Sequence, residues 1–286
     1  MRRLHPLLLP LWLACTGGAA AGTPAQRPPP VPIHASKIVL VGDSTTAVQS
    51  GWGPEFCARH VTASLSCVNL ARGGRSSYSY RAEGSWDIAL AEMRTPGYAS
   101  TWVLLQFGHN DQPGKPERST DLEHEFPDNL RRYISDIRAA GARPVLLTPL
   151  TRRQFDNEQL LDDLAPWAEA IRRVANELQV PLVDLHARSR AVVQAMGPVA
   201  AMQLAQRPAS QAQVVAALDG TTVDAEIGVA GSAQPETGIA TAKPMAQAKA
   251  AFDYTHLGPQ GAALFATLVS TELAKADPAL RPLLLP

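Results

Sequence analysis

Beyond residue 36, short apolar runs alternate with longer stretches whose apolar residues recur at helical spacing. Continuous apolar runs are typical of strands buried on both faces, which occur mainly in parallel sheets covered by helices. We therefore predict an α/β fold, a three-layer α/β/α sandwich around a five-stranded parallel sheet. The expected strands cover residues 37–41, 67–70, 102–107, 144–148 and 182–185. The expected helices cover residues 53–61, 86–93, 127–140, 158–178 and 261–274.

The N-terminal residues have the pattern of a secretory signal. Arg2 and Arg3 precede an apolar run too short to span a bilayer, and the alanines at 19–21 fit the small-x-small pattern of a cleavage site. We interpret residues 1–21 as a signal peptide and expect an exported protein, periplasmic or extracellular, with no transmembrane segment. A frayed N-terminal helix and a lipoprotein signal that places lipid on Cys15 are the alternatives.

The remaining chain divides by composition. Residues 22–35 are rich in proline, which predicts an extended linker before a single domain of residues 36–286. Within that domain, residues from about 198 to 251 are alanine-rich and show no clear strand, so they form either a lid over the site or a surface insertion. Export would leave Cys57 and Cys67, which can form one disulfide or remain two buried thiols.

Charge and histidine spacing exclude some classes of function. The 26 Lys and Arg residues balance the 26 Asp and Glu residues, so nothing indicates electrostatic attraction to nucleic acid or to an anionic membrane. We expect a monomer that needs no cofactor and no metal. Several histidines lack metal-ligand spacing and are read as ordinary residues: His5, His34, His60, His124 and His186.

Polar residues follow the ends of several predicted strands, where parallel α/β sheets gather reactive groups. Ser44 follows the first strand, Gly74 the second and Asn110 the third, while Asp253 lies three residues before His256 near the last helix. A serine nucleophile needs a neutral histidine to take its proton and a carboxylate to orient that histidine. N–H donors must also stabilise the oxyanion that forms. The sequence therefore predicts a serine hydrolase.

Four segments, in this order, resemble the blocks of the SGNH (GDSL) hydrolase superfamily. They are Gly42-Asp43-Ser44, Asn69 to Gly74, Gly108-His109-Asn110-Asp111 and Asp253 to His256. Longer runs resemble the rhamnogalacturonan acetylesterase family more narrowly: Gly42-Asp43-Ser44-Thr45, Gly73-Gly74-Arg75-Ser76-Ser77, Gln106 to Asp111 and Thr151 to Phe155. The similarity runs from about residue 37 to residue 274. The chain has no G-x-S-x-G elbow, which argues against an α/β-hydrolase.

The resemblance implies a flavodoxin-like sheet of the SGNH hydrolase type and acyl transfer to water through an acyl-serine. By this resemblance Ser44 is the nucleophile, His256 the base and then the acid, and Asp253 the orienting carboxylate. The oxyanion hole would comprise the Ser44 N–H, the Gly74 N–H and the Asn110 side chain. The implied substrate is O-acetyl on pectic rhamnogalacturonan, with other acetylated polysaccharides as alternatives.

Residues beside these blocks have expected supporting roles. We expect Asp43 and Asp111 to brace their loops and His109 to be a hydrogen-bonded scaffold residue. Arg75, Arg152 and Arg153 are candidates to bind substrate, and the last two could bind uronate carboxylates. A solvated or salt-bridged arginine pair is the alternative.

Two other functions are compatible with such a chain. One is an esterase, lipase or thioesterase of the same superfamily that acts on lipid-like or small esters. The other is a carbohydrate-binding protein that has kept the fold without the chemistry. The complete set of Ser44, Asp253, His256, Gly74 and Asn110 argues against the second.

Overall fold

The computed structural model describes residues 31, 33–223 and 250–285. The predicted signal at 1–21, with Cys15, lies outside the described residues, as do most of the predicted linker at 22–35 and residues 224–249 of the alanine-rich segment. His34–Pro286 forms one compact unit. The fold described below belongs to that unit.

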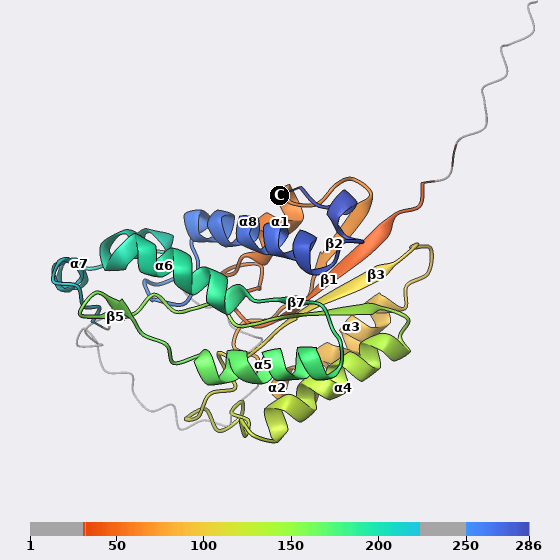
Figure 1. The fold of residues 1–286 in the computed structure, drawn as a ribbon, viewed down its shortest axis with the longest axis horizontal. Helices are drawn as coiled ribbons and strands as arrows, with labels where there is room; N and C mark the ends of the chain where they lie inside the picture. The colour runs from red at the N-terminus through yellow and green to blue at the C-terminus, as the bar shows by residue number, and fades with distance from the viewer. Residues whose placement is uncertain (1–30, 32, 224–249, 286) are drawn as a thin grey trace, which may run out of the picture. The chain divides into compact units, whose positions relative to one another are not determined.

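A parallel sheet lies at the centre of the unit, as the apolar runs predict (Figure 1). It has five strands in the order β2-β1-β3-β4-β7. Their bounds are β1 Ser36–Gly42, β2 Leu65–Asn69, β3 Thr101–Gln106, β4 Arg143–Leu147 and β7 Leu182–Val183. Each predicted strand overlaps an observed one, and the predicted α/β class with a five-stranded parallel sheet is confirmed.

Helices cover both faces of the sheet, which makes the three layers. In Figure 1, α1, α6 and α8 lie on one side of the sheet and α3, α4 and α5 on the other. The helices are α1 Gly53–Arg59, α2 Ser79–Ala82, α3 Ser85–Met93, α4 Glu125–Ala139, α5 Ala165–Glu177, α6 Leu185–Ala201, α7 Gln211–Leu218 and α8 Pro259–Ala276, with short 3₁₀ turns at Met202–Leu204 and Arg281–Leu283.

The core divides into two layers because successive residues of a strand point to opposite faces. In β1, Ile38 and Leu40 pack into the layer that contains Phe265 of α8. Val39 and Val41 pack into the opposite layer with the helices α3, α4 and α5. Both faces of β1 are therefore buried, which is why its sequence is a continuous apolar run.

The chain reverses direction across the sheet next to β1. After β1 it crosses to β2 at one edge of the sheet, and then returns to β3 on the other side of β1. Such a switch point leaves a crevice beyond the carboxyl ends of the strands, where ligands bind in open α/β sheets. The residues that follow β1 and β3 lie at this switch point.

One predicted helix begins too early. The sequence predicts a helix over 158–178, but α5 begins at Ala165, with a proline in its first turn. Residues before it form a small antiparallel hairpin of β5 (Phe155–Asp156) and β6 (Gln159–Leu160). The two connecting residues have positive φ angles, 48° and 65°, which is typical of a two-residue hairpin turn rather than a helix.

The region around β7 also differs from the expected pattern. The predicted strand at 182–185 ends after Val183, because the Asp184 side chain accepts a hydrogen bond from Ala187 N and caps α6. No helix is predicted from the sequence for most of the residues that form α6, Leu185–Ala201. Cys57 of α1 and Cys67 of β2 form a disulfide. Of the two alternatives left open for these cysteines, the structure therefore has the disulfide and not two buried thiols.

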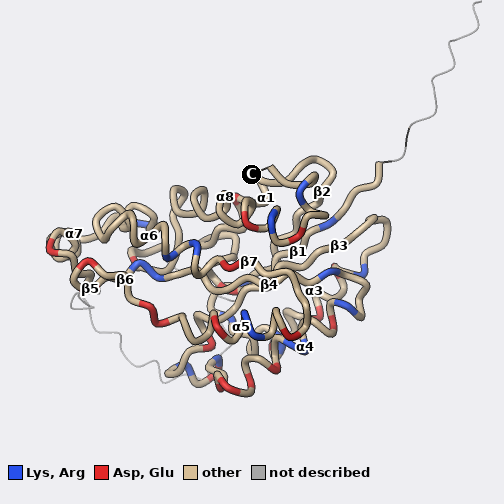
Figure 2. The backbone as a smooth tube through the Cα atoms, in the orientation of Figure 1, with Lys and Arg blue, Asp and Glu red and all other residues tan. Residues whose placement is uncertain are grey.

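The described surface carries both charges. Figure 2 shows acidic and basic positions interspersed along α4 and α5, where Arg131 pairs with Asp128 and Glu177. Within the described ranges, no helix combines the length and the apolar character needed to cross a membrane.

Candidate active site

The loop after β1 holds Ser44 at the switch point. Asp43 is fully buried, and its Oδ1 accepts hydrogen bonds from the Thr45 N–H and hydroxyl, both at 2.8 Å. Burial acts to raise the pKa of Asp43, but neighbouring His109 and the hydrogen bonds from Thr45 outweigh it, so the pKa lies below its usual value. The predicted bracing role of Asp43 is confirmed.

Tight packing under this loop explains the residues around it. A Cβ at Gly42 would lie 2.7 Å from the carbonyl oxygen of Gln106 on the neighbouring strand, so only glycine fits there. The Gln106 side chain accepts hydrogen bonds from the Thr46 hydroxyl and from the Trp52 indole. The amide of Asn69 donates to the Thr46 carbonyl at 2.9 Å, which ties the end of β2 to the same loop.

The turn before α8 brings the other two predicted triad residues to Ser44. His256 Nε2 lies 2.9 Å from Ser44 Oγ, and His256 Nδ1 lies 2.7 Å from Asp253 Oδ2. The second oxygen of Asp253 accepts from the backbone N–H groups of Thr255 and His256 at 2.7 and 2.6 Å. Although burial acts to raise the pKa of Asp253, these hydrogen bonds lower it to about 2.

This geometry sets the tautomer that the histidine needs. A carboxylate at Nδ1 favours a proton on that nitrogen and leaves the lone pair of Nε2 facing the Ser44 hydroxyl. Two residues that are 212 positions apart in the chain thus share a hydrogen bond. The arrangement can withdraw a proton from Ser44 as its oxygen attacks a carbonyl carbon.

The loops after β2 and β3 place Gly74 and Asn110 beside each other. Asn110 Nδ2 donates to the Arg75 carbonyl oxygen at 3.1 Å, so the amide lies against the loop that contains Gly74. Gly74 has a φ of 77°, a conformation that favours glycine. The neighbouring Gly73 lies against Ser44, because a Cβ there would be 3.7 Å from the Ser44 Cβ. The loops that carry the predicted oxyanion residues therefore lie next to one another, and the oxyanion hole itself stays a prediction.

The buried Asp111 side chain links these two loops by hydrogen bonds. One oxygen accepts from the Ser77 N–H at 3.0 Å and from the Ser77 and Thr120 hydroxyls, and the other accepts from the Gly108 N–H at 3.1 Å. The predicted bracing role of Asp111 is thus confirmed. Burial raises its pKa to about 7, against the hydrogen bonds that act to lower it.

Arg153 is predicted to bind substrate, but it is buried and does not reach the surface of the described structure. It is 1% exposed, and its guanidinium donates to the carbonyl oxygens of Asp253, Thr255 and His256 at 2.9, 3.2 and 2.8 Å. Its own N–H donates to the Tyr254 carbonyl at 2.9 Å. Burial lowers the pKa of Arg153 to about 10, which leaves it charged at neutral pH. The residue instead holds the turn that carries His256.

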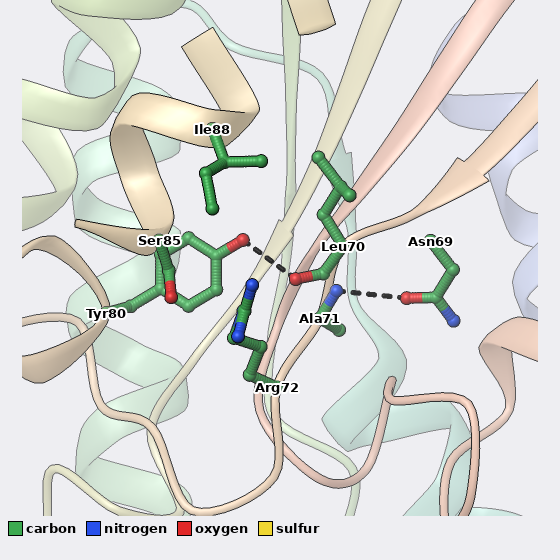
Figure 3. Close-up of a pocket in the computed structure, with 7 residues that line it drawn as sticks. All are labelled: Asn69, Leu70, Ala71, Arg72, Tyr80, Ser85 and Ile88. Atoms are coloured by element: carbon green, nitrogen blue, oxygen red, sulfur yellow. Dashed lines mark hydrogen bonds between the residues drawn. The ribbon is translucent and has the colours of Figure 1, made fainter. Parts of the chain in front are cut away.

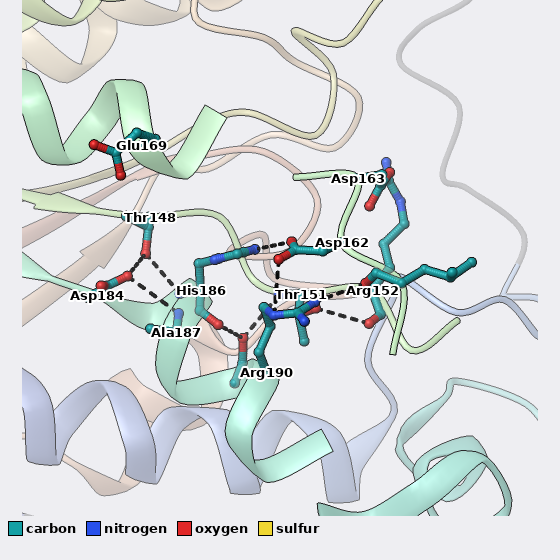
Figure 4. Close-up of polar contacts among 12 residues, drawn as sticks. Thr148, Thr151, Arg152, Asp162, Asp163, Glu169, Asp184, His186, Ala187 and Arg190 are labelled. Atoms are coloured by element: carbon teal, nitrogen blue, oxygen red, sulfur yellow. Dashed lines mark hydrogen bonds and ion pairs between the residues drawn. The ribbon is translucent and has the colours of Figure 1, made fainter. Parts of the chain in front are cut away.

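The other two predicted arginines have acidic partners at the surface. Arg75 pairs with Glu83 at 2.9 Å and donates to the Gly73 carbonyl. Arg152 pairs with Asp163, which is visible in Figure 4. The side chain of Arg75 is 22% exposed and that of Arg152 is 15% exposed, so both reach the surface. For Arg152, the structure has the salt-bridged arrangement that was the alternative to substrate binding.

His109 differs from its expected role in one respect. It is buried, but neither ring nitrogen has a hydrogen-bond partner among the described residues. Its Nδ1 lies 3.5 Å from Asp43 Oδ2, which is an ion-pair distance rather than a short hydrogen bond. The imidazole is therefore buried with Nδ1 at ion-pair distance from the Asp43 carboxylate.

Lys115 is a residue at the site that the sequence analysis missed. Its Nζ donates to the His109 carbonyl at 2.7 Å and lies 3.5 Å from Asn110 Oδ1. Burial, followed by the charges of Arg152 and Arg118, lowers the pKa of Lys115. The sequence signal that could have indicated Lys115 is its position four residues after Asp111, in a loop that contains a proline and a glycine.

A separate network holds the loop after β4. His186 Nε2 lies 2.8 Å from Asp162, which also pairs with Arg190, and Thr148 donates to Asp184 at 3.0 Å (Figure 4). Over the described ranges, no group of three or more histidine, cysteine or acidic side chains is placed to hold a metal ion.

A cavity of about 180 Å³ lies at the carboxyl end of β2 (Figure 3). The Tyr80 hydroxyl donates to the Leu70 carbonyl there at 2.8 Å, and Arg72 lies beside the ring. None of Ser44, Asp253 and His256 lines this cavity, so it is separate from the geometry described above.

Comparisons with known proteins identify the class. The model of the GDSL-like lipase/acylhydrolase family matches residues 40–203, more than half of the chain. A probable rhamnogalacturonan acetylesterase of Bacillus subtilis, YesY, is 35% identical over 164 residues, which cover 55% of this chain and 73% of the relative. The rhamnogalacturonan acetylesterase RhgT of the same organism is 36% identical over 170 residues, or 57% and 70% of the two chains.

A solved structure gives the same fold. Protein YxiM of Bacillus subtilis superposes with a TM-score of 0.59 at 22% identity, covering 85% of this chain and 57% of that longer one. The chain belongs to the GDSL-like lipase/acylhydrolase family and is a carboxylic ester hydrolase. The resemblance stated from the four sequence blocks is confirmed.

Proposed function

We propose that this hydrolase removes O-acetyl groups from pectic polysaccharide of the rhamnogalacturonan type. The observation that carries the proposal is the continuous relay from Ser44 Oγ through His256 to Asp253, with contacts of 2.9 and 2.7 Å. The names of the relatives YesY and RhgT support the acetylated pectic substrate.

In the proposed reaction, Ser44 Oγ attacks the acetyl carbonyl carbon while His256 Nε2 takes the hydroxyl proton. The Ser44 N–H, the Gly74 N–H and the Asn110 amide donate to the oxyanion of the tetrahedral intermediate. The intermediate collapses as the carbon–oxygen bond to the sugar breaks, and His256 returns its proton to the sugar oxygen. Acetyl-serine remains.

Water completes the cycle. His256 takes a proton from the attacking water, the second tetrahedral intermediate collapses, and acetate leaves as Ser44 Oγ recovers its proton from His256. Asp253 stays ionised throughout and orients the imidazole, consistent with its lowered pKa. The products are acetate and a free sugar hydroxyl.

Cations beside the oxyanion residues support a substrate that carries carboxylates. Lys115 lies against Asn110, and Arg118 lies close enough to Gly74 that a Cβ there would be 3.3 Å from its guanidinium. A uronate on the same polymer would find complementary charge at this edge of the site. A long acyl chain would find no such benefit.

The test compares substrates and one variant. Acetate release is measured on acetylated rhamnogalacturonan, acetylated xylan and p-nitrophenyl esters from acetate to octanoate. We expect the highest kcat/KM on the acetylated pectic substrate, and a loss of at least about 10⁴-fold in Ser44→Ala with the fold retained. A maximum at octanoate would support the lipid-like alternative, and undiminished turnover by Ser44→Ala would overturn the mechanism.

We also propose that the protein is exported, with residues 1–21 as the signal and 36–286 as the single hydrolase domain. The Cys57–Cys67 disulfide supports this, because such bonds persist in oxidising compartments. N-terminal sequencing of protein from the periplasmic fraction tests it. A mature chain that begins at Cys15 with bound lipid would instead show the lipoprotein alternative.

A further inference from the structure

A second cavity lies directly beside the triad, on the side of Asp253. It measures about 240 Å³, and its walls come from the turn before α8, the loop after β4 and helix α7. The volume is below the range of about 300–1,000 Å³ typical of pockets for drug-sized ligands. The cavity therefore suits one small unit of a larger ligand.

Gln213 of α7 has an unused donor in the wall of this cavity. Its side-chain oxygen accepts from the Ser210 N–H at 2.9 Å and completes the cap of the helix. Its Nε2 is buried and has no hydrogen-bond partner among the described residues, and the residue is only 2% exposed. Buried polar groups are nearly always paired, so the unpaired Nε2 of a residue that lines the cavity points to a ligand that accepts a hydrogen bond.

The remaining walls are polar but carry little uncompensated positive charge. Gln154 adds a second carboxamide, which can donate and accept, and Phe252 adds an apolar ring. Arg152 is paired with Asp163, while Asp253 contributes a carboxylate with a lowered pKa. An anionic ligand would be repelled by that carboxylate. The lining instead matches the hydroxyl groups and the apolar ring face of an uncharged sugar.

The alanine-rich segment fixes α7 in this position. Glu158 N donates to the Gly220 carbonyl at 2.8 Å, and Thr222 N donates to the Phe155 carbonyl at 2.9 Å, so the end of α7 is bound to the β5–β6 hairpin. Ala217 of α7 packs with Met202 and Tyr254 in a small core cluster. The described part of the segment is thus built into the wall beside the triad.

We propose that this cavity is a subsite for an uncharged sugar unit adjacent to the acetylated unit, and that Gln213 is a specificity-determining residue within it. The inference rests on the proposed function, because it takes the substrate to be an acetylated polysaccharide. It assigns to helix α7, in the described part of the alanine-rich segment, a role in selecting polymer over small esters. The cationic edge at Lys115 and this cavity then face different units of one polysaccharide chain.

The experiment compares two substrates in matched variants. Gln213→Glu keeps an acceptor for the helix cap but removes the unpaired donor of this lining residue. Its kcat/KM is measured on acetylated rhamnogalacturonan oligosaccharides and on p-nitrophenyl acetate. We expect the ratio of the two values to fall about fivefold, the size of one neutral hydrogen bond, mainly through KM for the oligosaccharide. Gln211→Ala, exposed on the same helix, should keep the wild-type ratio.

A second variant guards against a folding defect in the first. Gln154→Ala removes the other carboxamide without touching the helix cap, and the same fall in the ratio is expected. A wild-type ratio in both Gln213→Glu and Gln154→Ala, with near-ultraviolet circular dichroism unchanged, would overturn the subsite. Failure of the proposed function is distinguishable, because the wild-type protein would then release no acetate from the oligosaccharides.

Discussion

The loop that carries Ser44 and the turn that carries His256 are both held by buried ionisable side chains, which are acidic on the first side and basic on the second. On the Ser44 side, Asp43 and Asp111 accept hydrogen bonds from backbone N–H groups and hydroxyls. On the His256 side, Arg153 donates to three backbone carbonyl oxygens. The two sides meet at the Ser44–His256 hydrogen bond.

The difference follows from which backbone groups each loop turns toward the interior. The loops after parallel strands present N–H groups inward, and a carboxylate satisfies several of them at once. The turn before α8 presents carbonyls inward, since its N–H groups are taken by Asp253. A guanidinium has several donors in a fixed plane and no acceptor, so it suits that set. A buried side chain of either charge can therefore fix a catalytic loop when it satisfies several backbone groups of that loop.

The largest effect on turnover after loss of Ser44 itself is expected from Asp253→Asn. The amide would donate toward Nδ1 and favour the wrong tautomer of His256, leaving no lone pair facing Ser44. In a comparable triad the same change lowers kcat by about 10⁴-fold. Stopped assays on p-nitrophenyl acetate measure the loss, with thermal unfolding as the control for folding. A variant with more than a tenth of wild-type kcat would contradict the role of Asp253.

A smaller loss is expected on the opposite side of the site from Asn110→Ala. Removing one oxyanion donor costs about 10²- to 10³-fold in kcat, because the charge forms mainly in the transition state. KM for p-nitrophenyl acetate should change little. Lys115→Met is the comparison: it removes the cation beside Asn110 but leaves the amide donor, so its loss in kcat should be smaller. Equal losses would show that Lys115, rather than the amide, supports the oxyanion.

Arg153→Met tests whether the buried cation holds the His256 side. Three carbonyls would lose their donor, and we expect the free energy of unfolding to fall by about 3 kcal/mol. Displacement of His256 should lower kcat by roughly tenfold to a hundredfold. Urea titration and kcat are measured together. Arg153→Lys keeps the charge with fewer donors and should lie between the variant and wild type, whereas a Met variant with wild-type values would refute the positioning role.

The sequence predicts the Ser44 side better than the His256 side, because the contacts on the His256 side join residues that are far apart in the chain. Ser44, Gly74 and Asn110 each follow an apolar run, so strand ends alone bring them to one edge. Arg152 and Arg153 look equivalent as neighbours in the chain, and only packing reveals that one is buried beneath a turn about a hundred residues later.

The same limit explains the missed features around the cavity. The hairpin at residues 155–160 depends on two positive φ angles and on a backbone hydrogen bond from Thr222, which no local pattern indicates. Gln213 has an ordinary helix-cap signature, and its place beside Asp253 follows from the tertiary position of α7. Local propensity predicts elements, while the meeting of distant segments requires the packed structure.

The smallest effect on turnover is expected from Asp111→Asn. Its main consequence is a change in how the stability of the protein depends on pH. The folded-state pKa of Asp111 is raised from 3.8 to about 7, so between these values the folded protein holds a proton that the unfolded chain has released. This group therefore contributes stability at acidic pH that is lost as pH rises through that window. Asp43 acts in the opposite sense, because its pKa is lowered and its contribution is lost as pH falls.

Asparagine resembles the protonated acid, so unfolding in urea should show wild type losing stability relative to Asp111→Asn from pH 4 to 7. A difference between the two proteins that stays constant over this window would show that Asp111 is ionised throughout, and that the Ser44 side is held by two full charges.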